Sequence, residues 1–79
     1  MSSNDYQPIS CDLHSEYELL AMHRKPVTVQ YLDDQGAEQH FQGIIKDLVT
    51  RDGAEYMQLE GEDGTLEVRL DRIERVRKH

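Results

Sequence analysis

From Val27 onward, apolar and polar residues alternate in short runs separated by turn signals that contain glycine. The first run places Val27, Val29 and Tyr31 on one face, and residues 33–36 after it end in glycine. An alternation with a period of two predicts a half-buried strand, and such a turn predicts that the next strand runs back alongside it. This part of the chain is therefore expected to form an antiparallel β-domain.

The same reading predicts four more strands, so that strands span about residues 27–76. In the second, Phe41, Gly43 and Ile45 share a face, and Gly43 marks where a strongly bent strand tolerates the loss of a side chain. Asp52-Gly53 and Asp63-Gly64 are hairpin signals. The remaining expected strands are a third at 56–60, a fourth with Leu66, Val68 and Leu70 on one face, and a short last one with Ile73 and Val76.

Residues 11–24 contain neither Pro nor Gly, and their apolar residues recur at helical spacing. Ser15 and Glu18 have the form of a capping box, in which a hydroxyl and a carboxylate satisfy backbone N–H groups at a helix start. Pro26 cannot continue a helix, so it ends this one. We expect a helix at about 12–24 whose exact start stays open, and Pro8 favours an extended arm before it.

One helix followed by five short strands, the second long and bent at a glycine, is the order of an Sm-like barrel. The pattern Val27-x-Val29-x-Tyr31-Leu32, followed by Phe41-x-Gly43-x-Ile45-x-Asp47, looks like the first Sm motif. Other small barrels such as the OB-fold remain alternatives. With 79 residues the chain has room for one domain. We predict a mostly β fold: an N-terminal arm at 1–10 and a single domain at 11–79, a small Sm-like five-stranded antiparallel barrel preceded by one α-helix.

Acidic residues dominate the chain, with 16 Asp and Glu against nine Lys and Arg and a net charge of −7. Residues 69–79 carry five basic side chains against two acidic ones, so the first 68 residues hold a charge of −10. Such a body repels phosphate backbones and is steered toward cationic surfaces. A basic protein partner is therefore favoured over nucleic acid.

The sequence offers little for catalysis or for a cofactor. Cys11 is the only cysteine, and it lies three residues from His14; two ligands do not make a zinc site, and a thiol with one imidazole lacks an oxyanion pocket. No glycine run could cradle a phosphate. We predict a protein without metal or cofactor that is not an enzyme.

The same features bear on where the protein works. A lone cysteine favours the reducing cytoplasm, and neither a signal peptide nor an apolar run of about 20 residues is present. We expect a cytoplasmic protein without membrane contact, acting as a monomer.

RNA binding is the main alternative function, because Sm-like barrels often hold RNA and the C-terminal segment is basic. Arg69, Arg72, Arg75 and Lys78 would be its cationic residues. Against it stand the acidity of the rest of the chain and its few aromatic residues, four Tyr and one Phe, for base stacking.

The helix supplies the stronger functional signal. Asp12 and Glu16 are four residues apart and project from one side of it, and Asp5 and Glu18 add to the negative field. Acids at a helix start also stabilise the dipole, by roughly 0.3–1 kcal/mol each. Their concentration beside two tyrosines, a residue type enriched at interfaces, predicts a contact surface. The two tyrosines are Tyr6 and Tyr17.

The segment Tyr6-Gln7-Pro8-Ile9-Ser10-Cys11-Asp12 closely resembles the start of Rof, the Rho-binding antiterminator family of bacteria. The likeness continues through Asp47-Leu48-Val49-Thr50-Arg51, Glu55-Tyr56 and Leu70-Asp71-Arg72-Ile73, and so covers nearly the whole chain. The resemblance implies an Sm-like fold with an N-terminal helix. It also implies a protein that inhibits transcription termination by binding factor Rho and covering its primary RNA-binding site.

Carried over by position, the resemblance points to Cys11, Asp12, Glu18 and the turn at Arg51. The chain departs from the family pattern in two places. Leu13-His14-Ser15 stands where the family usually has an Asp-Tyr-Asp type sequence, so one or two acidic contacts are either absent or moved to Glu16. Asp52-Gly53 replaces a basic or amide pair. The predicted partner-binding set is Asp5, Tyr6, Cys11, Asp12, Glu16, Tyr17, Glu18, Arg51 and Asp52.

Overall fold

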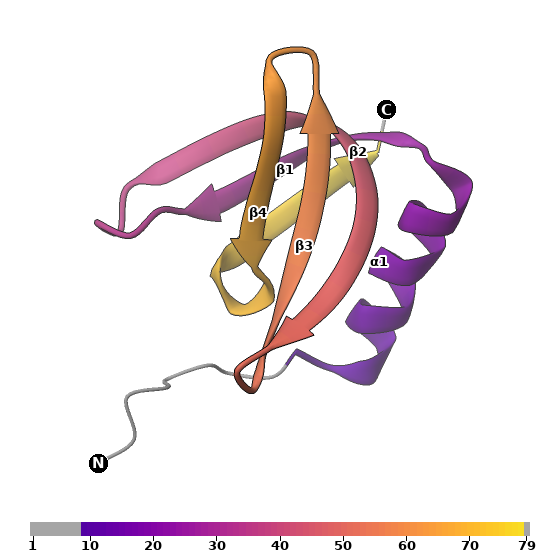
Figure 1. Cartoon of the computed structure of the whole chain (residues 1–79), viewed down its shortest axis with the longest axis horizontal. Helices are drawn as coiled ribbons and strands as arrows, with labels where there is room; N and C mark the ends of the chain where they lie inside the picture. The colour runs from indigo at the N-terminus through magenta and orange to yellow at the C-terminus, as the bar shows by residue number, and fades with distance from the viewer. Residues whose placement is uncertain (1–8, 79) are drawn as a thin grey trace.

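The computed structural model describes residues 9–78 (Figure 1). Helix α1 (Cys11–His23) comes first, and the chain continues into strands β1 (Pro26–Leu32), β2 (Glu38–Arg51), β3 (Ala54–Gly61) and β4 (Gly64–Arg69). A 3-10 turn, η1 (Leu70–Arg72), then leads into β5 (Ile73–Lys78). The prediction of a mostly β fold with one helix before five strands is confirmed.

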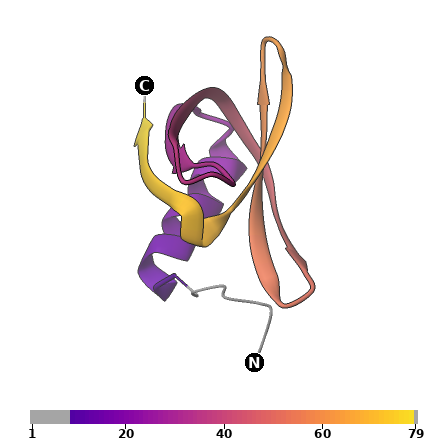
Figure 2. The ribbon, with the colours of Figure 1, turned by 90° about the vertical axis from the view of Figure 1, so that its left-hand side faces the viewer.

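All five strands belong to one antiparallel sheet with the order β4-β3-β2-β1-β5. The long strand β2 holds it together, because residues 38–44 pair with β1 and residues 44–51 pair with β3. The sheet coils as Figure 2 shows. Within residues 9–78, β4 and β5 have no ladder with each other. The expected barrel is therefore a strongly curved sheet that is not strictly closed.

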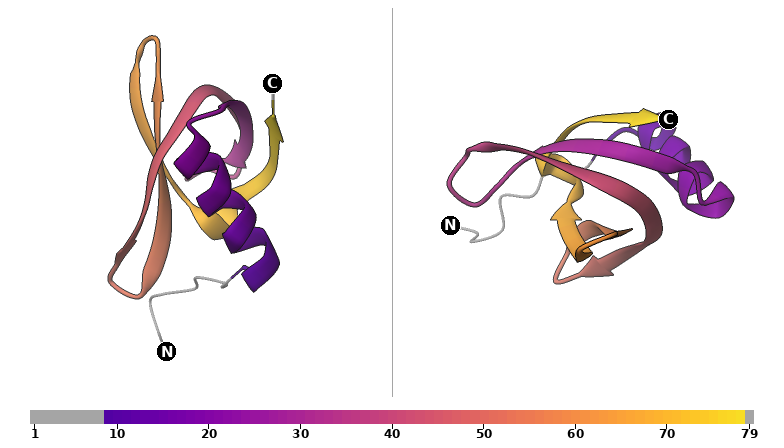
Figure 3. Two further views of the ribbon diagram at one scale, coloured as in Figure 1. Left: turned by 90° about the vertical axis from the view of Figure 1, so that its right-hand side faces the viewer. Right: turned by 90° about the horizontal axis from the view of Figure 1, so that it is seen from above.

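Two local features bend β2. A Cβ on Gly43 would lie 2.3 Å from the carbonyl oxygen of Glu60, so only glycine lets β3 approach this closely. Lys46 is an extra residue between the pairs that Ile45 and Asp47 form with β3, which is a β-bulge. Both features lie where β2 passes from one partner strand to the other, and they account for the curve visible in Figure 3.

The core lies between the inner face of this sheet and helix α1, which packs mainly on β2 (Figure 3). The alternation read from the sequence supplies the strand side chains. The core members are Tyr17, Leu20, Val27, Val29, Ile45, Met57, Leu59, Val68 and Leu70. Leu70 was expected within the fourth strand and instead begins the turn η1.

Helix α1 begins at Cys11, within one residue of the expected start at about residue 12, and not at the Ser15–Glu18 pattern. Ser10 is the N-cap, and its hydroxyl accepts the backbone N–H of Leu13 at 3.2 Å. Ser15 and Glu18 lie inside the helix, so the predicted capping box is wrong as a helix start. At the other end Arg24 adopts a left-handed conformation with φ of 52°, and Pro26 begins β1.

The β1–β2 turn is organised by Asp33. Its carboxylate accepts the backbone N–H groups of Ala37 and Gln35, each at 2.9 Å, and the side-chain amide of Gln39 at 3.0 Å. The hydrogen bond from Ala37 contributes most to lowering the pKa of Asp33, and those from Gln39 and Gln35 and the nearby Arg72 guanidinium lower it further.

No helix in the described part of the chain is long and apolar enough to cross a membrane.

Candidate protein-binding surface

One side of α1 faces solvent and carries the predicted acids. Asp12, Glu16, Leu19 and His23 follow one another at helical spacing on this side, and all are exposed. A groove of about 400 Å³ runs along it and ends near the C-terminus of β5. We call it the α1 groove; its lining residues are Asp12, Ser15, Glu16, Leu19, Leu20, His23, Lys25 and Lys78.

Asp12 and Glu16 have no ion-pair partner in the described part of the chain. Asp12 lies in the first turn of α1, where a negative charge also favours the helix dipole. The two acids thus present negative charge to solvent from a rigid element.

Glu18 belongs to the other edge of the helix. It does not line the α1 groove, and its Oε1 lies 3.5 Å from Nδ1 of His14. The Nε2 atom of the same imidazole lies 2.8 Å from Oε2 of Glu55, at the start of β3. His14 therefore attaches α1 to the sheet. The structure brings Asp12 and Glu16 together and separates Glu18 from them.

Sequence reasoning missed this role of His14. A neutral imidazole carries a single N–H, so it can donate to only one of the two carboxylates, and the protonated ring can donate to both. His14 and Glu55 are 41 positions apart. No local pattern indicates such a contact, which depends on how α1 lies against the sheet.

The expectation for Tyr17 needs correction. Its side chain is 3% exposed and belongs to the hydrophobic core, so it is not an aromatic residue of the contact surface. It falls on the side of α1 that faces the sheet, together with Leu20. Tyr6 and Asp5, the other members of the predicted set before the helix, lie outside the described residues.

Arg51 and Asp52 lie at the β2–β3 turn, at the same end of the molecule as the start of α1 (Figure 1). Asp52 and Gly53 both have positive φ, 51° and 80°, as a tight hairpin turn with the strand twist requires. The Arg51 guanidinium pairs with Glu67 and lies 4.7 Å from the centroid of the Tyr56 ring. Arg51 is thus held on the sheet by two neighbours.

Cys11 is exposed and carries a free thiol at the start of α1. No group of three or more His, Cys, Asp or Glu side chains in residues 9–78 is arranged to hold a metal ion. The pair that the sequence offered, Cys11 with His14, is not extended by a third ligand there.

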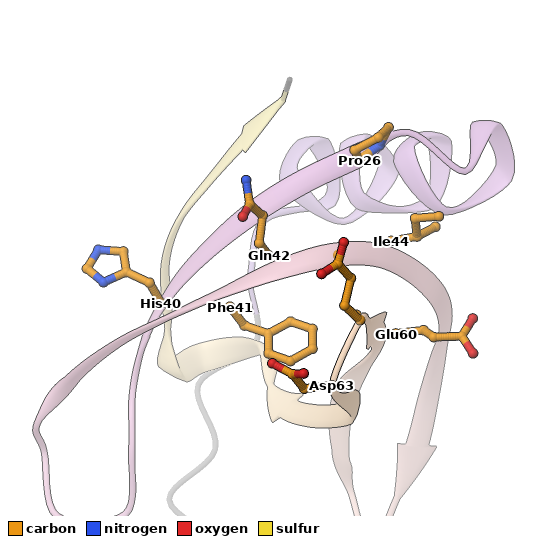
Figure 4. A pocket seen from close by; sticks show the side chains of 10 residues that line it. Pro26, His40, Phe41, Gln42, Ile44, Glu60 and Asp63 are labelled. Carbon is orange, nitrogen blue, oxygen red and sulfur yellow. The ribbon is translucent and has the colours of Figure 1, made fainter.

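A second, wider hollow of about 960 Å³ lies beneath the bend of β2 (Figure 4). The ring of Phe41 covers Gly43 and Gly61 in its wall, because a Cβ on either glycine would lie within 3.0 Å of that ring. Glu60, which also lines the hollow, lies 3.9 Å from the amine of Lys46. Glu62 and Asp63 complete its acidic rim at the β3–β4 turn.

Some of the basic side chains of the C-terminal segment make contacts within the fold. Arg69 makes two hydrogen bonds to the carboxylate of Asp71, at 2.6 and 3.1 Å. Arg72 donates to the carbonyl oxygen of Asp33 at 2.9 Å, which attaches η1 to the β1–β2 turn. Two of the four cations proposed for RNA binding are therefore engaged in structural contacts, whereas Arg75 and Lys78 are exposed.

Comparison with known proteins identifies the family. Residues 8–79 match the family model described as "Modulator of Rho-dependent transcription termination (ROF)". The chain belongs to this family. It is 35% identical over 71 residues to Protein rof of Escherichia coli strain K12 and, to the same extent, to Protein rof of Shigella flexneri. Each alignment covers 90% of this chain and 80% of the relative. No solved structure matches the chain.

Membership in the Rof family makes this protein a modulator of Rho-dependent transcription termination, and it confirms the resemblance read from the sequence. The family description names a regulator of transcription rather than an enzyme.

Proposed function

We propose that this protein inhibits transcription termination in the bacterial cytoplasm by binding Rho through the exposed side of α1, which blocks the primary RNA-binding site of Rho. A site that holds RNA must present cations to phosphate groups. Carboxylates on a protein can occupy the same cations, and a bound protein domain then excludes the RNA. The proposal is one of competition for a shared surface.

The observation that carries the proposal is the pair Asp12 and Glu16. Both are exposed on one side of a helix, and neither has a cationic partner among residues 9–78. Their charge acts with the net charge of −7, which favours approach to a basic surface. The family description supplies the connection to Rho.

The other predicted partner-binding residues differ in where they lie relative to the exposed side of α1. Cys11 is exposed at the start of α1, and Arg51 and Asp52 lie at the same end of the molecule, so a partner seated on the helix start could reach them (Figure 1). Glu18 is exposed midway along α1, outside the α1 groove. Tyr17 is buried in the core, so it holds α1 in place and does not contact a partner.

The proposal is tested by measuring how this protein displaces a labelled single-stranded RNA from Rho, using fluorescence anisotropy at several salt concentrations. Inhibition should weaken with salt, because the Debye length falls from ~10 Å at 0.1 M to ~3 Å at 1 M. The Asp12→Lys/Glu16→Lys variant should lose most of its ability to displace RNA at low salt.

A matched control changes charge by the same amount elsewhere. Glu62→Lys/Asp63→Lys replaces two exposed acids at the β3–β4 turn, at the opposite end of the molecule from the start of α1 (Figure 1). It should retain most of the inhibition. Equal loss in both variants would mean that only net charge matters, and unchanged inhibition by the α1 variant would remove the helix from the interface. Tight binding of the RNA by this protein alone would favour the RNA-binding alternative.

A further inference from the structure

Every large exposed apolar side chain in the described part of the protein lies on α1. These are Leu13 at 37% exposure, Leu19 at 52% and Met22 at 73%. The large apolar side chains of the strands, in contrast, are buried or partly buried. Exposed apolar residues gathered on one element mark interaction surfaces more often than scattered ones do. Leu19 and Met22, the two most exposed of these three side chains, make the solvent side of α1 apolar as well as acidic.

Leu19, which is 52% exposed, lines the α1 groove. Leu20, which is buried, forms part of the groove wall beside it. Met22 is three residues after Leu19, so the two neighbour each other on the helix surface. Leu13 does not line the groove. The groove thus offers an apolar contact midway along α1, and in the free protein this contact faces water.

The charges along the groove change sign around Leu19. Asp12 and Glu16 lie toward the start of α1, whereas Lys25 follows the helix and Lys78 ends β5. The helix start and the end of β5 lie well apart in Figure 1. A ligand that spans the groove would meet negative charge, then an apolar surface, then positive charge, and only one orientation along the helix would suit it.

We propose that the α1 groove seats an apolar side chain of Rho between a basic side chain directed at Asp12 and Glu16 and an acidic one directed at Lys25 and Lys78. This inference rests on the proposed binding to Rho and specifies the chemistry of that contact. Charge complementarity along the groove selects this occupant. The acids steer the approach, and the apolar contact at Leu19 slows dissociation.

Two Leu→Ser variants in the same helix test the apolar contact. The affinity for intact Rho is measured at several salt concentrations for the wild type, Leu19→Ser and Leu13→Ser. Leu19→Ser should lower the affinity about tenfold or more, which is the size of effect expected when an apolar hot spot is removed. This factor should be the same at every salt concentration, because the contact is not electrostatic. Leu13→Ser should stay within about twofold of the wild type, because its side chain is outside the groove. Thermal melting verifies that both variants are folded.

Charge reversal at the other end of the groove tests the orientation. Attraction by net charge alone predicts that Lys25→Glu/Lys78→Glu binds a basic partner more tightly, because the variant is more acidic. The groove predicts the opposite, a loss of about threefold or more at low salt, since two like charges would then face each other. The two readings differ in sign.

The outcomes separate this inference from the proposed function. If wild-type protein fails to bind Rho, both are overturned. If it binds and Leu19→Ser binds equally well, or if Lys25→Glu/Lys78→Glu binds more tightly, the groove proposal is overturned while the acidic contact through Asp12 and Glu16 stands. Loss with Leu19→Ser but not with Leu13→Ser, together with a loss in the lysine variant, supports the groove.

Discussion

The phenol of Tyr17 lies in the core, where the charged phenolate would lose its hydration. Burial, and after it the negative charge of Glu16, raise the pKa of Tyr17 above its usual value of 10.0. A raised pKa in the folded state means that the unfolded chain loses this proton first as the pH rises. The contribution of Tyr17 to stability is therefore complete below pH 10 and is lost as the pH rises through the folded pKa.

This loss can be measured by urea unfolding at a series of pH values from neutral to strongly alkaline. The wild type should lose more stability above pH 10 than Tyr17→Phe, which keeps the ring and has no proton to lose. Other groups titrate in both proteins, so the difference between them isolates Tyr17. A parallel decline of the two curves would show that the phenol is not protected from water. Tyr17→Ala should cost about 3 kcal/mol or more at neutral pH.

Helix α1 carries the proposed contact, so its first turn affects both stability and function. The Ser10 hydroxyl accepts the N–H of Leu13, whereas Ser15 is a helix-interior residue exposed to solvent. Ser10→Ala should therefore lower the free energy of unfolding by about 1 kcal/mol, and Ser10→Asp should retain most of it. Ser15→Ala should be neutral or slightly stabilising, because Ala is the better helix former. Urea unfolding of the three variants makes the comparison, and an equal cost at both serines would contradict the assigned cap.

The helix also shows what the sequence could predict and what it could not. Its existence and its end followed from spacing and from Pro26, but its exact start stayed open, because the motif with a serine and an acid three residues apart lies inside the helix and does not indicate Ser10. The strands were predictable because alternation and glycine turns are local signals. The pairing of residues 26–32 with both β2 and β5 depends on the whole sheet, and alternation alone does not specify it.

The candidate site, like the helix, could be predicted from the sequence only in part. Asp12 and Glu16 were predicted together because a four-residue spacing on a helix is local geometry. Tyr17 was assigned to the surface because residue type suggests an interface, yet which side of the helix is buried depends on how α1 packs. Lys25 and Lys78 meet at one groove, and His14 meets Glu55, only because distant segments come together in the fold.

At the scale of the molecule, the open edges of the sheet decide whether copies associate. Within residues 9–78, β4 pairs only with β3 and β5 only with β1, so each has one unpaired side. Pairing of β4 from one copy with β5 of the next would be a head-to-tail contact, which closes into rings or continues as filaments. Both edges are short and carry charged residues, which disfavours such pairing. The net charge of −7 adds repulsion between copies.

The protein is therefore expected to sediment as a 9.2 kDa monomer from low to high micromolar concentration. Arg75 and Arg77 alternate along β5, so Arg75→Val/Arg77→Val makes one side of this edge apolar. That variant should self-associate at concentrations where the wild type does not, because charge no longer protects the edge. Sedimentation velocity distinguishes the two species. If the wild type instead forms oligomers that grow with its concentration, backbone pairing at the sheet edges outweighs the repulsion between the charged side chains there. The protein would then bind Rho as an assembly of several copies.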